Sequence, residues 1–224
     1  MAGISSKLKH LIESKTAIDF SLSNTTLEES DLDPSIKSTP TLLGTYTYED
    51  VVESLRQYGI TESLNAIGFK DLIVEMDTTD PFVHSVTVSD KALSYKQPQD
   101  RFLIQFFLRR KIMEYCDLSK HTDSDSEVKL FMRESLNWQI KITLIEWLSM
   151  QNPTESFSKE RPQLPDQKHP GLKIARNVIT MFEDLAKKHD RDGLLNFPEH
   201  FHNAWLYSRK NMFFLNPQVE GSFS

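Results

Sequence analysis

Hydrophobic and polar positions divide the chain into a polar N-terminal stretch and a longer part with regular periodicity. From residue 21 to residue 39, Ser, Thr, Asp and Glu dominate, and Pro34 and Pro40 interrupt any repeat. Such a segment buries too little apolar surface to offset the entropy lost on ordering. We therefore expect residues 1–40 to be a partly disordered extension with a short helix, and residues 41–224 to form a single domain.

The first half of this domain has the pattern of two short helices followed by a hairpin. A brief extended run is expected at residues 41–46, and the two helices that follow it should end at Gly59 and Gly68. Residues 72–76 and 83–88 have strand patterns and lie on either side of a segment rich in turn formers. Two such runs predict a pair of strands joined as a hairpin.

The second half alternates between strand and helix patterns. Residues 101–110 fit a buried strand or a helix, and their aromatic side chains favour the strand; helical spacing returns at residues 128–136. Residues 140–148 are rich in β-branched and aromatic side chains and form the strongest strand candidate. A helix opening at residues 171–176 and a short apolar strand at residues 194–197 complete a strand, crossover helix and parallel strand. The sequence therefore predicts an α/β fold, a mixed sheet flanked by helices, with its ligand edge at the strand ends.

Composition and charge exclude several classes of protein. The formal net charge is −6, from 32 acidic and 26 basic residues, so no global field would hold a nucleic acid or an anionic membrane surface. The single cysteine, Cys116, excludes an intramolecular disulfide framework. No apolar run approaches the roughly 18 residues of a membrane-spanning helix, and residues 1–20 lack the apolar centre of a secretory signal. We expect a cytoplasmic protein that makes no contact with membranes or nucleic acids.

A motif near the C-terminus carries the most specific signal. Asn203, Ala204, Leu206 and Tyr207 occur with the spacing N-A-x-x-L-Y, and Asn211 follows four residues after the tyrosine. This segment resembles the N-A-x-x-L-Y-x-x-x-G-F motif of the GNAT superfamily of acyl-CoA-dependent N-acyltransferases. Asparagine tolerates the left-handed backbone that the family's glycine supplies. The alternative is an amphipathic helix that packs Ala204 and Leu206 inward.

The resemblance covers about residues 140–221 and implies a splayed central sheet that binds acetyl-CoA or another acyl-CoA as co-substrate. In that family the backbone of the first of these strands pairs with the pantetheine arm. The corresponding residues here are Leu148, Ser149 and Met150. Asn203 is implied as a further cofactor-binding residue, and the implied reaction moves the acyl group to an amine acceptor.

The same family has a phosphate loop, R/Q-x-x-G-x-G/A, that wraps the CoA pyrophosphate at a helix N-terminus. Pro170 stands where arginine or glutamine is expected, Lys173 replaces the central glycine, and Ala175 fits the final small position. The resemblance places the following residues at the pyrophosphate: Gly171, Lys173, Ile174, Ala175 and Arg176.

Lys173 is the main departure from this loop. A non-glycine residue forced into the left-handed conformation costs on the order of 1 to 2 kcal/mol. The loop could instead keep Lys173 helical, and the cations of Lys173 and Arg176 beside a phosphate would regain about 0.3 to 1 kcal/mol. Because these contributions nearly cancel, the loop is compatible with CoA binding but does not by itself indicate it.

The resemblance implies direct attack of the amine on the thioester, assisted by a base and an acid. Tyr207 is the implied acid, which protonates the departing thiolate. Glu146, on the predicted central strand, is the candidate base, and His200 or His202 is an alternative. A strand amide near Leu148 would polarise the thioester carbonyl.

Two other interpretations stay open. The departures at Pro170 and Lys173 favour a non-catalytic GNAT-like binding or interaction module with a degenerate phosphate loop. His200 and His202 alternate on an extended segment and would suit a metal-dependent hydrolase, but no third ligand follows at a helpful spacing, so we expect no metal site. Trp147 is expected to fill the core.

Overall fold

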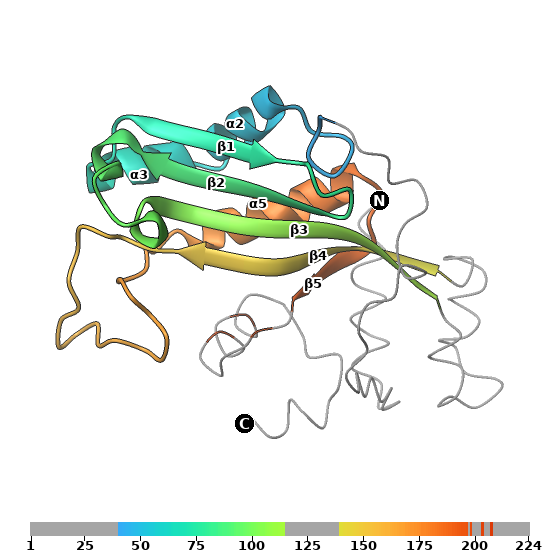
Figure 1. Cartoon of the computed structure of the whole chain (residues 1–224). Coiled ribbons are helices and arrows are strands. Elements are labelled where there is room, and N and C mark those ends of the chain that lie inside the picture. The colour runs from blue at the N-terminus through green and yellow to red at the C-terminus, as the bar shows by residue number, and fades with distance from the viewer. Residues whose placement is uncertain (1–39, 115–138, 197, 199–202, 204–206, 208–224) are drawn as a thin grey trace, which may run out of the picture.

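The computed structural model describes residues 40–114, 139–196, 198, 203 and 207. Its helices are α2 (Tyr48–Gln57), α3 (Ile60–Ile67) and α5 (Ala175–Lys188), and its strands are β1 (Leu72–Asp77), β2 (Val83–Asp90), β3 (Phe102–Glu114), β4 (Gln139–Met150) and β5 (Gly193–Asn196) (Figure 1). Two short 3-10 helices, η2 (Lys91–Leu93) and η3 (Pro98–Asp100), lie between β2 and β3. No helix among these residues is long and apolar enough to cross a membrane.

The strands form one mixed sheet in the order β1-β2-β3-β4-β5. The neighbours from β1 to β4 are antiparallel, and β5 returns parallel to β4 after α5. This confirms the predicted fold class, the hairpin of β1 and β2, and the unit of strand, crossover helix and parallel strand. Residues 101–110, which fitted either element, belong to β3.

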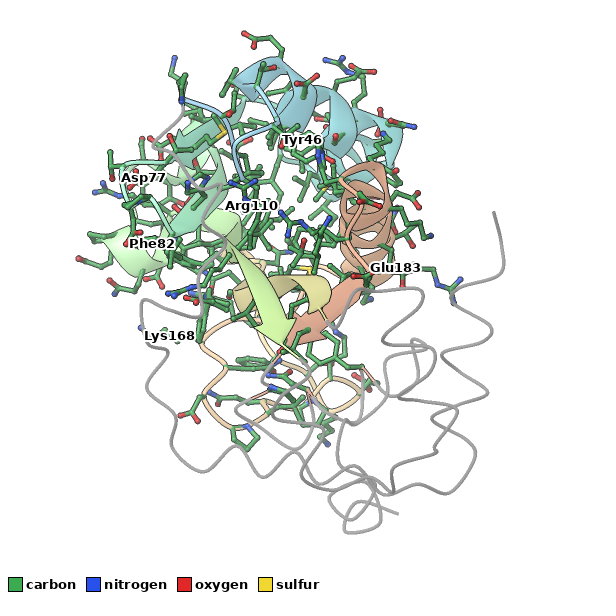
Figure 2. The ribbon with its side chains drawn as sticks, turned by 90° about the vertical axis from the view of Figure 1, so that its right-hand side faces the viewer. Tyr46, Asp77, Phe82, Arg110, Lys168 and Glu183 are labelled. Carbon is green, nitrogen blue, oxygen red and sulfur yellow. The ribbon has the colours of Figure 1, made fainter. Side chains whose placement is uncertain are left out.

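All three helices lie on one face of the sheet (Figures 1 and 2). Alternate side chains of β2 and β3 face them, and the buried apolar ones include Val86, Val88, Ile104, Phe106 and Leu108. Phe106 meets Phe182 of α5 edge to face, with the ring centroids 5.0 Å apart. The apolar positions of α5 therefore form its buried face, which includes Val178 and Met181.

The ends of α2 and α3 follow from local sequence. Thr47 and Asp50 form a capping box at the start of α2, in which the Thr47 N–H donates to the Asp50 carboxylate at 2.9 Å. Gly59 and Gly68 have φ angles of 68° and 122°, a region that side chains disfavour. The two glycines therefore end the helical segments where the sequence predicts.

The extended run predicted at residues 41–46 is wrong, because this segment forms a tight turn. Leu42 and Tyr46 make an isolated antiparallel bridge, and Leu43 and Gly44 between them have φ angles of 52° and 72°. The Leu43 N–H donates to Nδ1 of His84 at 2.8 Å. His84 is 41 residues away in the chain, so the local pattern did not indicate the turn.

The predicted helix at residues 128–136 lies outside the described residues. The same holds for residues 1–39 of the predicted extension.

Candidate functional site

Strand β5 ends well before its neighbour β4 does. Their pairing runs from Ile142 and Gly193 to Ile145 and Asn196, whereas β4 continues to Met150. Beyond Ile145, β4 is paired with β3, and no other described residue pairs with its second edge. Figure 1 shows β5 ending beside the middle of β4. Within the described part of the chain, this edge of residues 146–150 is therefore open to an extended ligand.

A β-bulge at Glu146 lies where the pairing of β4 with β5 ends. Leu108 pairs with Ile145 and Phe107 pairs with Trp147, so Glu146 is the extra residue on β4. A bulge bends its strand and increases the local twist. The bend comes directly after the last residue of β4 that pairs with β5.

Glu146 lies at this point with its carboxylate already engaged. It forms an ion pair with Arg109 of β3, in which Nε and Oε1 are 2.5 Å apart, on the sheet face opposite the helices. The Glu146 side chain alone is only 27% exposed. The residue is nevertheless exposed when its backbone atoms are included. Its backbone therefore supplies much of the accessible surface, as expected at an open edge.

The three residues predicted to bind pantetheine continue along the same edge. Leu148, Ser149 and Met150 are half-buried, and Leu148 and Met150 pack against the core. Trp147 precedes them and is 44% exposed. The prediction that Trp147 fills the core is wrong, because the residue follows the bulge and lies on the less covered part of β4.

The N-terminus of α5 is held beside the end of β4. The Asn152 N–H donates to the Pro170 carbonyl at 2.7 Å, and the Met150 carbonyl lies 3.7 Å from the position of a Cβ on Gly171. Ile174 precedes the helix without a side-chain cap, and the first turn contains no acidic residue. The backbone N–H groups and the dipole of such a helix end favour an anion.

Within the predicted phosphate loop, Lys173 has the unusual backbone. Its φ angle is 64° and its side chain is exposed, so the residue adopts the left-handed conformation that glycine would adopt without strain. Gly171 lies outside that region, and a Cβ there would make only ordinary contacts. Of the remaining predicted residues, Ile174 is buried, and Ala175 and Arg176 are exposed at the first turn of α5.

Arg161 is a residue of this loop that the sequence did not indicate. Its guanidinium donates to the Gly171 carbonyl at 2.7 Å and pairs with Glu155 at 2.8 Å. An arginine is therefore present at the loop even though Pro170 occupies the place where the family motif has one. Arg161 comes from the irregular connection 151–174, where no periodicity could indicate which side chain turns back.

Tyr207 lies at the carboxyl end of β5. The residue is helical, packs against the buried core, and shares a hydrogen bond with the side chain of Asn196, the last residue of β5. Burial raises the pKa of Tyr207, and the hydrogen bond from Asn196 opposes this rise. Asn196 pairs with Ile145, which adjoins Glu146. The predicted acid therefore lies at the end of β5 beside Glu146, but it packs against the core on the helix side of the sheet, whereas the Glu146 carboxylate pairs with Arg109 on the opposite face.

The structure covers the remaining predicted site residues unevenly. Asn203 is helical and half-buried. His200 and His202 lie outside the described residues. Within the described ranges, no group of three His, Cys, Asp or Glu side chains is arranged to hold a metal ion.

The chain matches no protein-family model, no curated protein and no solved structure. The chemistry of the candidate site therefore has to be inferred from the arrangement of its own residues. An open strand edge, an uncapped helix N-terminus and a half-buried phenol lie at the carboxyl ends of β4 and β5. This arrangement suits an extended ligand with an anionic end whose leaving group accepts a proton.

Proposed function

We propose that this protein transfers an acyl group from acetyl-CoA or another acyl-CoA to an amine. The observation that carries the proposal is the second edge of β4, which has no described partner after the pair of Ile145 and Asn196, with the hydroxyl of Tyr207 bound to Asn196 at the same point. The resemblance of the segment around Tyr207 to the GNAT motif supports the same conclusion.

In the proposed complex, the pantetheine arm lies along residues 146–150 and pairs with the β4 backbone as a further strand would. The diphosphate meets the first turn of α5, where Lys173 and Arg176 add positive charge. Support for this position comes from the left-handed backbone of Lys173, because that conformation is the one a phosphate loop with glycine would adopt at this place.

The proposed reaction is a direct displacement. The amine nitrogen forms a bond to the thioester carbon, the bond from carbon to sulfur breaks, and the proton lost by the amine goes to a base. Tyr207 gives its proton to the departing thiolate; its phenol is protonated at neutral pH, because its pKa lies above the ordinary value of about 10. Glu146 serves as the base when it is released from Arg109, and His202 is the alternative.

The test combines ligand binding with turnover. Acetyl-CoA should raise the melting temperature of the protein, and a panel of primary amines should release free CoA from it. Tyr207→Phe should leave acetyl-CoA affinity unchanged and slow the transfer by about 100-fold or more, because only the leaving group loses its acid. Tyr95→Phe is the matched control, since Tyr95 is 74% exposed, and its turnover should equal that of the wild type. Equal rates in Tyr207→Phe and wild type would remove Tyr207 from the mechanism.

A non-catalytic binding or interaction module is the second candidate. Its support is the ion pair that occupies the Glu146 carboxylate and the bulk of Lys173 where the family has glycine. This candidate predicts a melting-temperature increase with acetyl-CoA but no release of CoA with any amine. Failure of acetyl-CoA to bind at all would contradict both candidates, and an effect of zinc or a chelator on activity would favour the metal-dependent hydrolase instead.

A further inference from the structure

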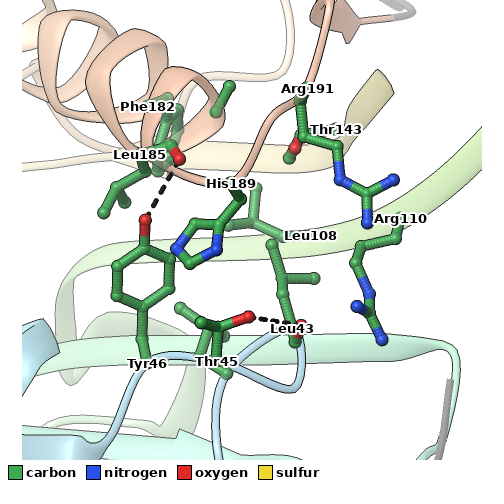
Figure 3. Close-up of a pocket in the computed structure, with 12 residues that line it drawn as sticks. Leu43, Thr45, Tyr46, Leu108, Arg110, Thr143, Phe182, Leu185, His189 and Arg191 are labelled. Atoms are coloured by element: carbon green, nitrogen blue, oxygen red, sulfur yellow. Dashed lines mark hydrogen bonds between the residues drawn. The ribbon is translucent and has the colours of Figure 1, made fainter. Parts of the chain in front are cut away.

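A cavity lies at the opposite end of the parallel strands from the proposed acyl-CoA site, near the start of β4 and β5 (Figure 3). Its volume is about 120 Å³, which is smaller than the usual range for drug-sized ligands. The turn at residues 41–46, the C-terminal part of α5 and the helix-facing sides of β3 and β4 form its walls. Thr143 is its contact with β4, whereas the proposed acyl-CoA site begins at Glu146, so the two sites use different parts of the strand.

Several long-range contacts hold the walls of this cavity in place. The Tyr46 hydroxyl donates to the Leu185 carbonyl at 3.0 Å, and the Tyr46 ring meets His189 edge to face with centroids 4.2 Å apart. Nδ1 of His84 accepts a hydrogen bond from the Leu43 N–H and so holds the turn against β2. The cavity is therefore preformed, and a ligand would not have to order the turn on binding.

The polar part of the lining is positively charged. Arg110 and Arg191 both contribute to it, their side chains extend on the same side of the His189 ring in Figure 3, and no carboxylate belongs to the described lining. Both arginines also have other interactions in the protein, but a guanidinium carries five N–H donors and can serve more than one acceptor. The turn approaches Arg110 closely, since a Cβ on Gly44 would lie 3.1 Å from its Nη2.

His189 supplies a third polar group. Its Nε2 atom is buried and has no hydrogen-bond partner among the described residues. Burial lowers the pKa of His189, and the neighbouring charges of Arg191, Arg110 and Lys188 lower it further. A buried nitrogen of this kind is expected to have a partner, and a neutral imidazole can donate to an anion from it.

The remaining wall is apolar. Leu42, Leu108 and Phe182 are fully buried there. A ligand that fills the cavity therefore needs a charged end for the arginines and a short apolar body for this wall. A simple inorganic anion would satisfy only the first requirement.

We propose that this cavity is a second binding site, specific for a small carboxylate with a short aliphatic body. The carboxylate would accept charge-assisted hydrogen bonds from Arg110 and Arg191 and a hydrogen bond from His189. Its aliphatic part would pack on Leu108 and Phe182. The site does not depend on the proposed acyl transfer, because none of the residues that bind acyl-CoA in that proposal lines it.

Butyrate is a suitable probe, with its neutral isostere butyramide and inorganic phosphate as comparisons. The imidazole resonance of His189 can be assigned among the seven histidines by its loss in His189→Gln. Butyrate should shift this resonance to saturation at millimolar concentration and raise the pKa of His189, because an anion beside an imidazole stabilises its charged form. The melting temperature should rise in parallel.

Variants separate the charged lining from general effects of charge. Arg191→Gln should weaken butyrate binding about ten-fold, the loss expected for one charge-assisted hydrogen bond. Lys187→Gln is the matched control, because Lys187 is an exposed cation near the same helix end and is not part of the lining. The butyrate affinity of this variant should equal that of the wild type.

Three results would overturn the proposal. The first is an unperturbed His189 resonance together with an unchanged melting temperature in wild-type protein at saturating butyrate, of which the melting temperature needs no variant. The second is equal binding of butyramide, which would make the cavity an apolar site only. The third is saturation by phosphate without any effect of butyrate, which would exclude recognition of the aliphatic body.

Discussion

Lys173 carries backbone strain at the start of α5. Its φ angle of 64° lies in the region where an L-residue is disfavoured by on the order of 1 to 2 kcal/mol. Lys173→Gly should remove this strain, and part of the gain is offset by the greater freedom of glycine in the unfolded chain. We therefore expect the free energy of unfolding, measured by urea denaturation, to rise by up to about 1 kcal/mol.

Two further variants distinguish strain from charge at this position. Lys173→Ala removes the ammonium but keeps the strain, so its stability should match the wild type, whereas Gly171→Ala should be tolerated because its backbone is unstrained. In the proposed function, Lys173→Glu should weaken acetyl-CoA binding more than Lys173→Gly does. Equal stability of Lys173→Gly and Lys173→Ala would show that the left-handed conformation carries no measurable strain.

At the scale of elements, β4 has two parts with different surroundings. Residues 142–145 pair with strands on both edges, whereas residues 146–150 have a described neighbour only in β3. If an acyl-CoA adds to the open edge, amide hydrogen exchange of residues 146–150 should slow on binding, because backbone groups on that edge gain partners. Exchange of residues 142–145 is the internal control and should not change. Equal protection of both parts would indicate general stabilisation rather than pairing with the edge.

Periodicity predicted most of these elements because each is amphipathic by itself. The spacing of Val178, Met181 and Phe182 fixes both the existence and the buried face of α5, and the β-branched run in β4 is a strand over its whole length. The turn at residues 41–46 was not predictable, because it depends on Gly44 and on a distant acceptor, His84. The bulge at Glu146 was not predictable either, since a bulge is a property of the register between two strands and not of one.

The candidate site was predictable where it follows chain order and not where it depends on long-range contacts. The order of β4, α5, β5 and Tyr207 places the predicted residues near one end of the parallel strands, as expected for such a unit. The ion pair of Glu146 with Arg109 and the bond from Arg161 to Gly171 join separate segments. No pattern in either segment indicates its partner, so the sequence predicted neither the ion pair of Glu146 nor the contact of Arg161 with the loop.

At the scale of the whole molecule, two histidines link stability to pH. His84 and His189 contact the turn at residues 41–46 from opposite sides. Burial is the largest cause of the lowered pKa of each, and the charged neighbours are Arg110, Asp80 and Asp77 for His84, and Arg191, Arg110 and Lys188 for His189. Arg110 lowers the pKa of His84, whereas Asp80 and Asp77 oppose that change.

The sign of the pH dependence follows from these directions. Each folded-state pKa lies below the ordinary value of 6.5, so the unfolded chain binds more protons as the pH falls through this range. The stability that the histidines contribute is complete above pH 6.5 and is lost as the pH falls from there toward their folded-state pKa values. Each histidine can contribute up to about 1.4 kcal/mol per pH unit in that window, which denaturation at a series of pH values would measure.

His84→Asn tests the residue that anchors the turn. An asparagine Oδ1 can accept the Leu43 N–H in place of Nδ1 and does not titrate, so this variant should be stable near neutral pH and should have a shallower pH dependence. His84→Leu removes the acceptor, and because the Leu43 N–H is then left without its partner, stability should fall by about 1 to 3 kcal/mol at every pH. If His84→Asn keeps the full slope of the wild type, protonation of His84 does not contribute to acid destabilisation, and His189 becomes the group to replace next.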